Sequence, residues 1–179
     1  IDLRVASSVA FTVTAFRMGY YNGAGARKVW KSPIELPANT KRNTVYIDST
    51  RTLLPEWKTP LLIDTNDWLP GVYLLKLTPR GKHGYGRWVP YVVRSESTLG
   101  KVVLQPSVFT AQAYNGWGGK SLYKGSIGFG SRAYAVGIAR PYFEGAGAGR
   151  LLVPYELPIV NLAESLDIPI AYETDFDIS

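Results

Sequence analysis

The first 97 residues contain a series of short segments in which apolar and polar residues alternate, and this pattern limits the folds open to the chain. Alternation with a period of two is typical of β-strands that bury one face. Turn-forming pairs such as Asn22–Gly23, Pro70–Gly71 and Arg80–Gly81 separate several segments. The segments are residues 1–7, 11–18, 43–49, 60–65, 71–79 and 87–95. They predict an antiparallel, immunoglobulin-like β-sandwich domain over residues 1–97.

The pattern changes after residues 95–100, a small and polar stretch that we interpret as a linker. Residues 101–109 form a nearly continuous apolar run, which is typical of a buried parallel strand. A glycine-rich aromatic loop is expected over 107–123, and a further strand over 131–142. A helix is predicted to begin near Glu156 or Leu157, and a strand is predicted at 168–175.

These elements after the linker form one β-α-β unit. A single unit leaves strand edges and one sheet face bare. We therefore expect residues 101–179 to be the first part of an α/β domain that a missing C-terminal segment or a partner chain completes.

Composition excludes several kinds of function. The 179 residues contain no cysteine, which removes disulfides, thiol nucleophiles and cysteine-bound zinc. The net charge is +6, but Lys and Arg are scattered, so nucleic-acid binding is not expected. The sequence has no apolar run of the length of a membrane span. Either redox compartment suits a cysteine-free chain, and we expect an extracytoplasmic or secreted location.

The titratable residues offer few candidates for a base or a ligand set. The single histidine, His83, lies in a glycine-rich turn and is interpreted as a solvated turn residue. Asp64 and Asp67 lie in a segment typical of a structural turn. Glu173 and Asp175 follow the last predicted strand, where they either face a site or cap the helix after it.

The segment "AYNGWGGKSLY", residues 113–123, places two tyrosines, Tyr114 and Tyr123, around a glycine-broken loop. Its glycines disfavour regular helix. One interpretation is aromatic packing, which the spacing alone favours. The other is a metal site, because a hard cation such as Fe(III) binds phenolate oxygen well.

Four stretches, residues 16–30, 60–77, 109–123 and 155–178, together resemble the N,N-dimethylformamidase large (beta) subunit family and its bacterial relatives. The resemblance covers almost the whole chain in the same order. It implies a β-sandwich followed by a glutamine-amidotransferase-like α/β region. It also implies a mononuclear iron, held by two tyrosines and one glutamate, that activates water for amide hydrolysis.

By motif, the first iron ligand matches Tyr114 and the second best matches Tyr123, with Tyr155 as the alternative. The glutamate has no counterpart in the chain. The resemblance therefore implies part of an iron-dependent hydrolase of small amides, with homo-oligomers left open. The alternative is a non-catalytic extracellular binding or structural module. Such a module would bind carbohydrate through some of its tryptophans, Trp30, Trp57, Trp68, Trp88 and Trp117.

Overall fold

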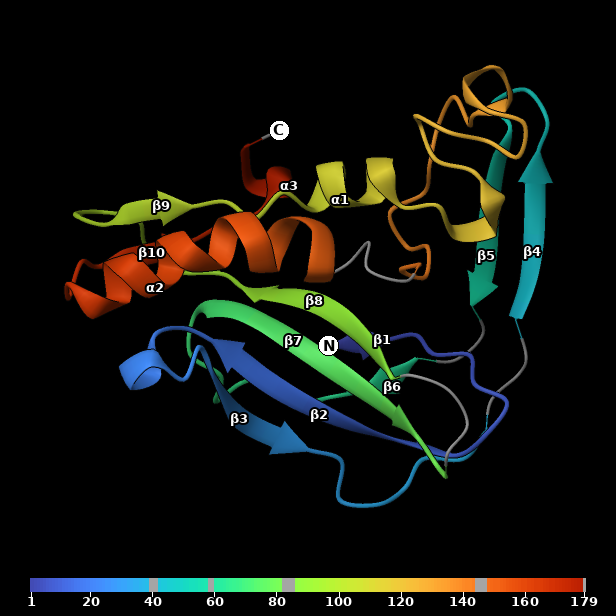
Figure 1. Cartoon of the computed structure of the whole chain (residues 1–179). Helices are drawn as coiled ribbons and strands as arrows, with labels where there is room; N and C mark the ends of the chain where they lie inside the picture. The colour runs from blue at the N-terminus through green and yellow to red at the C-terminus, as the bar shows by residue number, and fades with distance from the viewer. Residues whose placement is uncertain (39–41, 58–59, 82–85, 144–147, 179) are drawn as a thin grey trace.

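The computed structural model describes residues 1–38, 42–57, 60–81, 86–143 and 148–178 (Figure 1). The strands are β1 (Asp2–Leu3), β2 (Phe11–Met18), β3 (Ala26–Lys31), β4 (Arg42–Ile47), β5 (Thr52–Trp57), β6 (Leu61–Leu62), β7 (Gly71–Pro79), β8 (Arg87–Val93), β9 (Val102–Leu104) and β10 (Ile170–Tyr172). The α-helices are α1 (Val108–Tyr114), α2 (Leu157–Ser165) and α3 (Asp175–Ile178), and a π-helical segment, Ala148–Glu156, precedes α2.

The centre of the fold is a four-stranded antiparallel sheet in the order β3-β2-β7-β8. β2 and β7 pair along most of their length, from Phe11 opposite Pro79 to Arg17 opposite Tyr73. Their alternating residues send side chains to opposite faces, so each face acquires an apolar surface. The sequence prediction of antiparallel strands is confirmed here. The immunoglobulin-like and amidotransferase-like details stay predictions, as do the domain boundaries 1–97 and 101–179.

Both faces of this sheet are covered. On one face, Val13, Ala15 and Leu75 pack with residues of the short β1–β6 pair. On the other face, Val72 and Leu74 pack with residues of the π-helical segment, α2 and β10. Figure 1 shows α2 lying along this second face. The helix layer is therefore attached to the sheet through a shared apolar core.

The two strands and the helix of the predicted β-α-β unit are present as β9, α2 and β10. β9 and β10 are parallel, with Val102 opposite Ile170 and Leu104 opposite Tyr172. α2 begins at Leu157, with Pro158 in its first turn, where a missing backbone N–H costs no helical hydrogen bond.

No helix in the described ranges is long and apolar enough to cross a membrane.

A separate hairpin, β4–β5, packs against the long segment between α1 and the π-helical segment (Figure 1). Thr52 Oγ1 donates a hydrogen bond of 2.7 Å to the carbonyl of Ala135, and the indole of Trp57 donates one of 2.8 Å to the carbonyl of Ala139. These bonds join segments about 80 residues apart. The hairpin is therefore tied to the segment between α1 and the π-helical segment rather than to the central sheet.

Three predictions about local structure were wrong. Residues 131–142 form no regular strand; they run as an irregular segment whose polar groups bond to β5 and its turn. Residues 108–114 are helical rather than loop, and β3 and β5 were missed. α1 has only seven residues, and a distant carboxylate stabilises its start: Asp175 Oδ2 accepts the backbone N–H of Phe109 at 2.7 Å. His83 lies outside the described residues.

Candidate functional site

The structure brings the two predicted tyrosine ligands together. Tyr114 is the last residue of α1, and Tyr123 lies nine residues later in the loop. Their rings are stacked, with centroids 4.3 Å apart and an angle of 17° between the planes. The two side chains are 47% and 50% exposed. Two phenol groups are thus paired at the surface, where a ligand or metal ion has access to them.

Backbone hydrogen bonds fold the loop so that these rings meet. The N–H of Leu122 donates to the carbonyl of Ala113 at 3.0 Å, which places the residues after them, Tyr123 and Tyr114, side by side. Between these points the chain reverses through Gly118 and Gly119, whose φ angles are +75° and +81°. Only glycine adopts this left-handed region readily. The glycine content of the motif therefore serves the reversal that pairs the tyrosines.

Asn115 holds the reversal from inside. Its side chain is fully buried and takes part in four hydrogen bonds. Its Nδ2 donates to Gln112 Oε1 and to the carbonyl of Pro141, both at 2.9 Å. Its Oδ1 accepts the backbone N–H groups of Trp117 and Phe143. Asn115 thereby fixes the position of its neighbour Tyr114 relative to two other segments.

Arg140 is a buried cation beneath the same loop. Its guanidinium donates to the carbonyls of Gln112, Asn115 and Lys120 at 2.7, 2.9 and 3.1 Å. Because two of these carbonyls lie at the C-terminal end of α1, the cation is well placed for the helix dipole. Burial lowers the pKa of Arg140 to about 10. Arg140 is thus a structural clamp, and the loop sequence alone gave no signal of it.

The third predicted tyrosine, Tyr155, lies in the π-helical segment and is largely exposed. It is not part of the ring stack that Tyr114 forms with Tyr123. In the described part of the chain, no group of three or more His, Cys, Asp or Glu side chains is placed to hold a metal ion. Phenol oxygens, such as those of Tyr114 and Tyr123, are ligands that suit a hard cation.

Two of the carboxylates singled out from the sequence, Asp64 and Asp175, have structural roles. Asp64 Oδ1 accepts the backbone N–H of Asn66 at 3.0 Å, which confirms the predicted turn. Asp175, the first residue of α3, accepts hydrogen bonds from Gln105 and Phe109, so its side chain caps the start of α1. This placement arises because β9 and β10 are parallel and end at the same edge.

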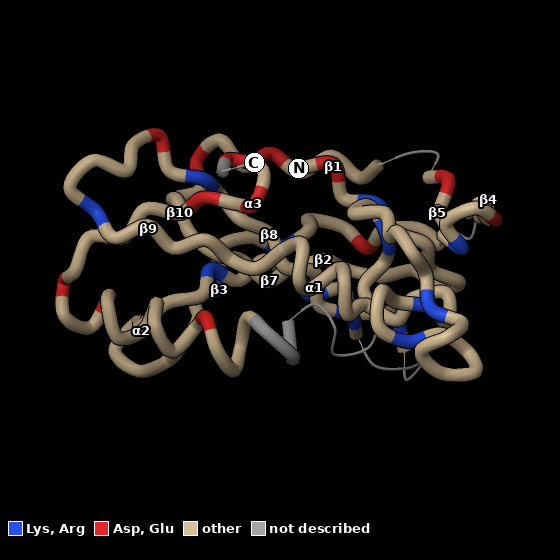
Figure 2. Tube along the Cα trace, turned by 90° about the horizontal axis from the view of Figure 1, so that it is seen from above, with Lys and Arg blue, Asp and Glu red and all other residues tan. Residues whose placement is uncertain are grey.

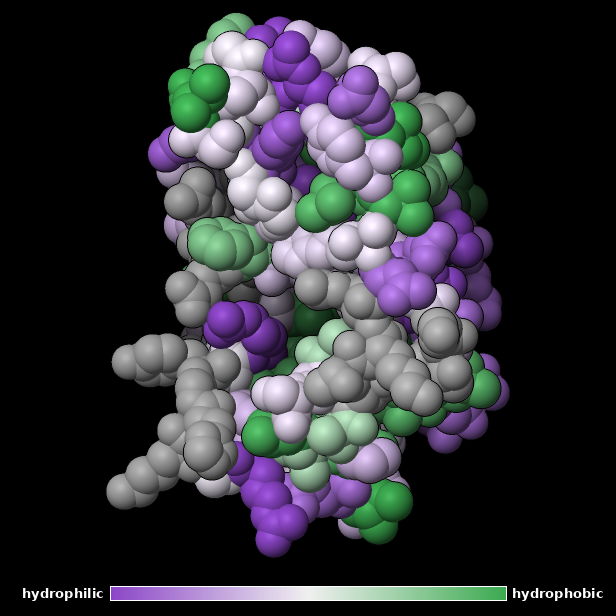
Figure 3. Space-filling view, turned by 90° about the vertical axis from the view of Figure 1, so that its right-hand side faces the viewer, coloured by the Kyte–Doolittle hydropathy of each residue, from purple (hydrophilic) through white to green (hydrophobic). Residues whose placement is uncertain are grey.

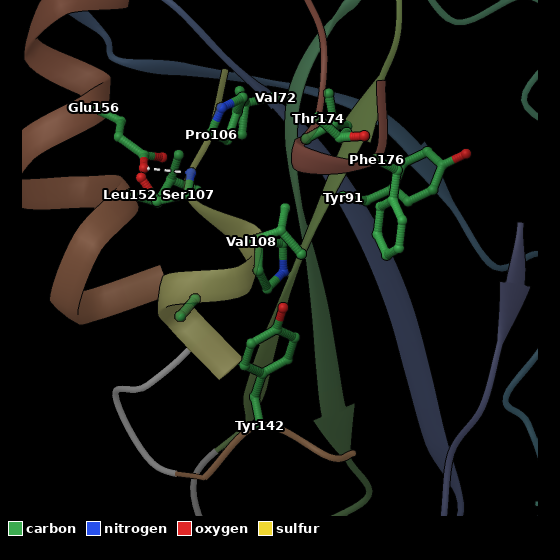
Figure 4. A pocket seen from close by; sticks show the side chains of 13 residues that line it. Val72, Tyr91, Pro106, Ser107, Val108, Tyr142, Leu152, Glu156, Thr174 and Phe176 are labelled. Atoms are coloured by element: carbon green, nitrogen blue, oxygen red, sulfur yellow. Dashed lines mark hydrogen bonds between the residues drawn. The ribbon is translucent and has the colours of Figure 1, made fainter. Parts of the chain in front are cut away.

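A cavity of about 190 Å³ lies between β8, the start of α1 and the π-helical segment (Figure 4). Its walls are mostly apolar, and Glu156 and three aromatic rings also line it. The lining includes Val72, Pro106, Val108, Ala111, Leu152, Tyr91, Tyr142 and Phe176. Tyr114 and Tyr123 do not belong to the lining, so the cavity and the tyrosine pair are different features. The sequence pattern gave no sign of the cavity, because its residues come from six separate segments.

Two of the tryptophans named for carbohydrate binding pack against the core, whereas Trp88 is 39% exposed, so that interpretation stays a prediction. Trp30 and Trp68 pack against the core between the sheet and the β1–β6 pair. Figure 2 shows Lys and Arg spread along the chain with Asp and Glu between them. The face that carries the β4–β5 hairpin and the loop mixes hydrophobic and hydrophilic side chains (Figure 3). Exposed rings on this part of the chain include those of Tyr46, Phe129 and Tyr134.

The fold and the loop define a β-rich protein that presents a tyrosine pair from a glycine-rich reversal. A family model, described as N,N-dimethylformamidase beta subunit-like, C-terminal, matches residues 12–179. The chain belongs to this family, which confirms the resemblance read from its motifs and places it, at family level, with dimethylformamidase-like hydrolases. Comparisons with curated proteins and with solved structures gave no significant match.

Proposed function

We propose that this chain is part of a hydrolase of small amides and that Tyr114 and Tyr123 supply two of the ligands of its metal ion, an iron. The observation that carries the proposal is the stacked, half-exposed pair of phenol rings with centroids 4.3 Å apart. Family membership supplies the reaction class. When bound, an iron ion at this place supplies Lewis-acid activation of water.

The residues of this chain prepare the pair for binding. Asn115 and Arg140 hold the two ends of the loop through buried hydrogen bonds, so the phenol groups are paired before a ligand arrives. Preorganisation of this kind lowers the entropy cost of binding. In this proposal, the glutamate that the resemblance implies as third ligand comes from a further segment or a partner chain.

The test measures iron and colour in the full-length natural protein and in single variants. Tyr114→Phe and Tyr123→Phe each remove one hydroxyl and keep the ring, so the stack and the fold should persist. Iron bound to tyrosinate absorbs visible light, and we expect about one iron per chain in the wild type. Both variants should lose most of the visible band, the bound iron and the amidase activity.

Tyr134→Phe is the matched control, because Tyr134 is equally exposed and lies in the same part of the fold but outside the pair. It should keep iron, colour and activity. A colourless, iron-free wild type, or a Tyr114→Phe variant with unchanged iron and colour, would overturn the assignment of the ligands. Loss of the band in Tyr155→Phe but not in Tyr123→Phe would move the second ligand to Tyr155.

A further inference from the structure

The cavity beside α1 combines a carboxylate with aromatic and aliphatic walls. Figure 4 shows Glu156 extending from the π-helical segment toward Ser107, with Val108 and Tyr142 below and Phe176 and Tyr91 on the far side. We propose that this cavity binds a small organic ammonium ion with an apolar substituent of about the size of benzene. The inference stands on this cavity alone and is independent of the tyrosine pair.

The charge of the ligand follows from Glu156. Its Oε1 accepts the backbone N–H of Ser107 at 2.8 Å. Among the described residues, ion pairs join Arg17 to Glu164, Arg80 to Glu35 and Arg94 to Asp177, and none of them includes Glu156. A carboxylate at an apolar wall is stabilised by a cation with N–H groups to donate. An ammonium ion meets this need, whereas a carboxylate ligand would be repelled.

The aromatic rings favour the same kind of ligand. Tyr91, Tyr142 and Phe176 line the cavity from three different segments. The faces of such rings attract organic cations, most strongly where water is excluded. Burial raises the pKa of Tyr142, so its phenol stays neutral at physiological pH. The rings therefore contribute attraction to a cation without adding charge.

The size of the ligand follows from the cavity volume of about 190 Å³. An apolar cavity of about 150 Å³ is known to accommodate benzene. The remaining space and the position of Glu156 at one side leave room for an amine group on such a ring. Val72, Val108 and Leu152 provide the apolar wall against which the substituent packs.

The test uses three probes of nearly the same shape: benzylamine, benzyl alcohol and benzoate. Binding to the protein at pH 7 is measured by calorimetry and by chemical-shift changes of residues in the lining. We expect benzylamine to bind at least tenfold more tightly than benzyl alcohol, and benzoate not to bind. Equal affinity for benzylamine and benzyl alcohol, or no binding of benzylamine, would overturn the proposal.

Two variants locate the site. Glu156→Gln keeps an oxygen that accepts the Ser107 N–H but removes the charge, so it should weaken benzylamine about tenfold and leave benzyl alcohol unchanged. Glu96→Gln removes the same charge from an exposed surface residue and should change neither. Ala111→Leu fills the cavity and should abolish both interactions. Unchanged benzylamine affinity in Glu156→Gln would refute the role of the carboxylate, whatever the iron content of the protein.

Discussion

Arg17 in β2 and Glu164 in α2 form an ion pair with 2.9 Å between Nη1 and Oε1, although 147 residues separate them in the sequence. The side chains are only 13% and 22% exposed. Glu164 Oε2 also accepts the backbone N–H of Tyr20, and Arg17 donates to the carbonyl of Pro70. Burial disfavours the charged guanidinium, but the hydrogen bonds and charges of Tyr21 and Glu164 outweigh it and raise the pKa of Arg17. One polar contact thus fastens the helix layer to the central sheet.

Replacing Glu164 by Gln should therefore lower the free energy of unfolding by about 2 kcal/mol, because a largely buried guanidinium loses its counter-charge. Urea unfolding followed by circular dichroism measures this change. Glu35→Gln is the control: its pair with Arg80 is exposed and 3.6 Å long, so its loss should cost less than about 0.5 kcal/mol. Equal effects of the two variants would show that the Arg17–Glu164 pair adds nothing beyond a surface contact.

Replacing Asn115 by Ala should destabilise the loop by about 2–4 kcal/mol, since four buried hydrogen bonds are lost together. In the variant, hydrogen exchange should be faster at the backbone amides of Trp117 and Phe143, because these two N–H groups donate to Asn115 Oδ1 in the wild type. Asn66→Ala, at an exposed turn, should change stability by less than about 0.5 kcal/mol. Unchanged protection of both amides in Asn115→Ala would contradict the role of Asn115 as the anchor of the loop.

Alanine substitutions at Gly118 and Gly119 separate the cost of backbone strain from the cost of a side-chain clash. Both have positive φ, so Ala at either position costs about 1–2 kcal/mol. A Cβ on Gly118 would also approach Leu53 Cδ2 to 2.5 Å, whereas one on Gly119 meets nothing within 4 Å. Thermal unfolding should therefore place Gly118→Ala below Gly119→Ala. The double variant Gly118→Ala with Leu53→Ala should show a smaller effect of the added methyl group, and equal melting temperatures of the single variants would argue against this contact.

Tyr172 has a buried hydroxyl for which the described residues provide no hydrogen-bond partner. Replacing it by Phe should leave stability at pH 7 unchanged or raise it by about 1 kcal/mol. A clear loss of stability would instead show that the hydroxyl is hydrogen-bonded.

The same residue predicts an alkaline effect. Burial raises the pKa of Tyr172 to about 12, against about 10 for an exposed tyrosine. The raised pKa of Tyr172 contributes to the free energy of unfolding, fully so below pH 10. This contribution is lost as the pH rises toward 12, because the phenol loses its proton at a lower pH in the unfolded state than in the folded state. Urea unfolding between pH 8 and 11.5 should show a smaller alkaline loss in Tyr172→Phe than in the wild type, and Tyr134→Phe should match the wild type. Identical alkaline profiles for wild type and Tyr172→Phe would refute this contribution.

Local pattern was sufficient for much of the framework. The alternation in residues 71–79 predicted β7 with its observed bounds, and the apolar spacing after Glu156 predicted α2. The motif around Tyr114 identified the family and named the tyrosine pair. These features are readable because strand and helix periods and turn residues act over a few neighbouring positions.

Contacts between distant segments decided the rest. α1 is too short for its period to be recognised, and Asp175 stabilises its start from 66 residues away. Residues 131–142 contain apolar residues suited to a strand, yet their polar groups bond to the β4–β5 hairpin instead. The sequence by itself determined the antiparallel strands other than β3 and β5, together with α2 and the two phenols of the loop. Only the tertiary structure decided that these phenols stack and that Glu156 faces an aromatic cavity, because both depend on buried hydrogen bonds and packing between segments that no local pattern relates.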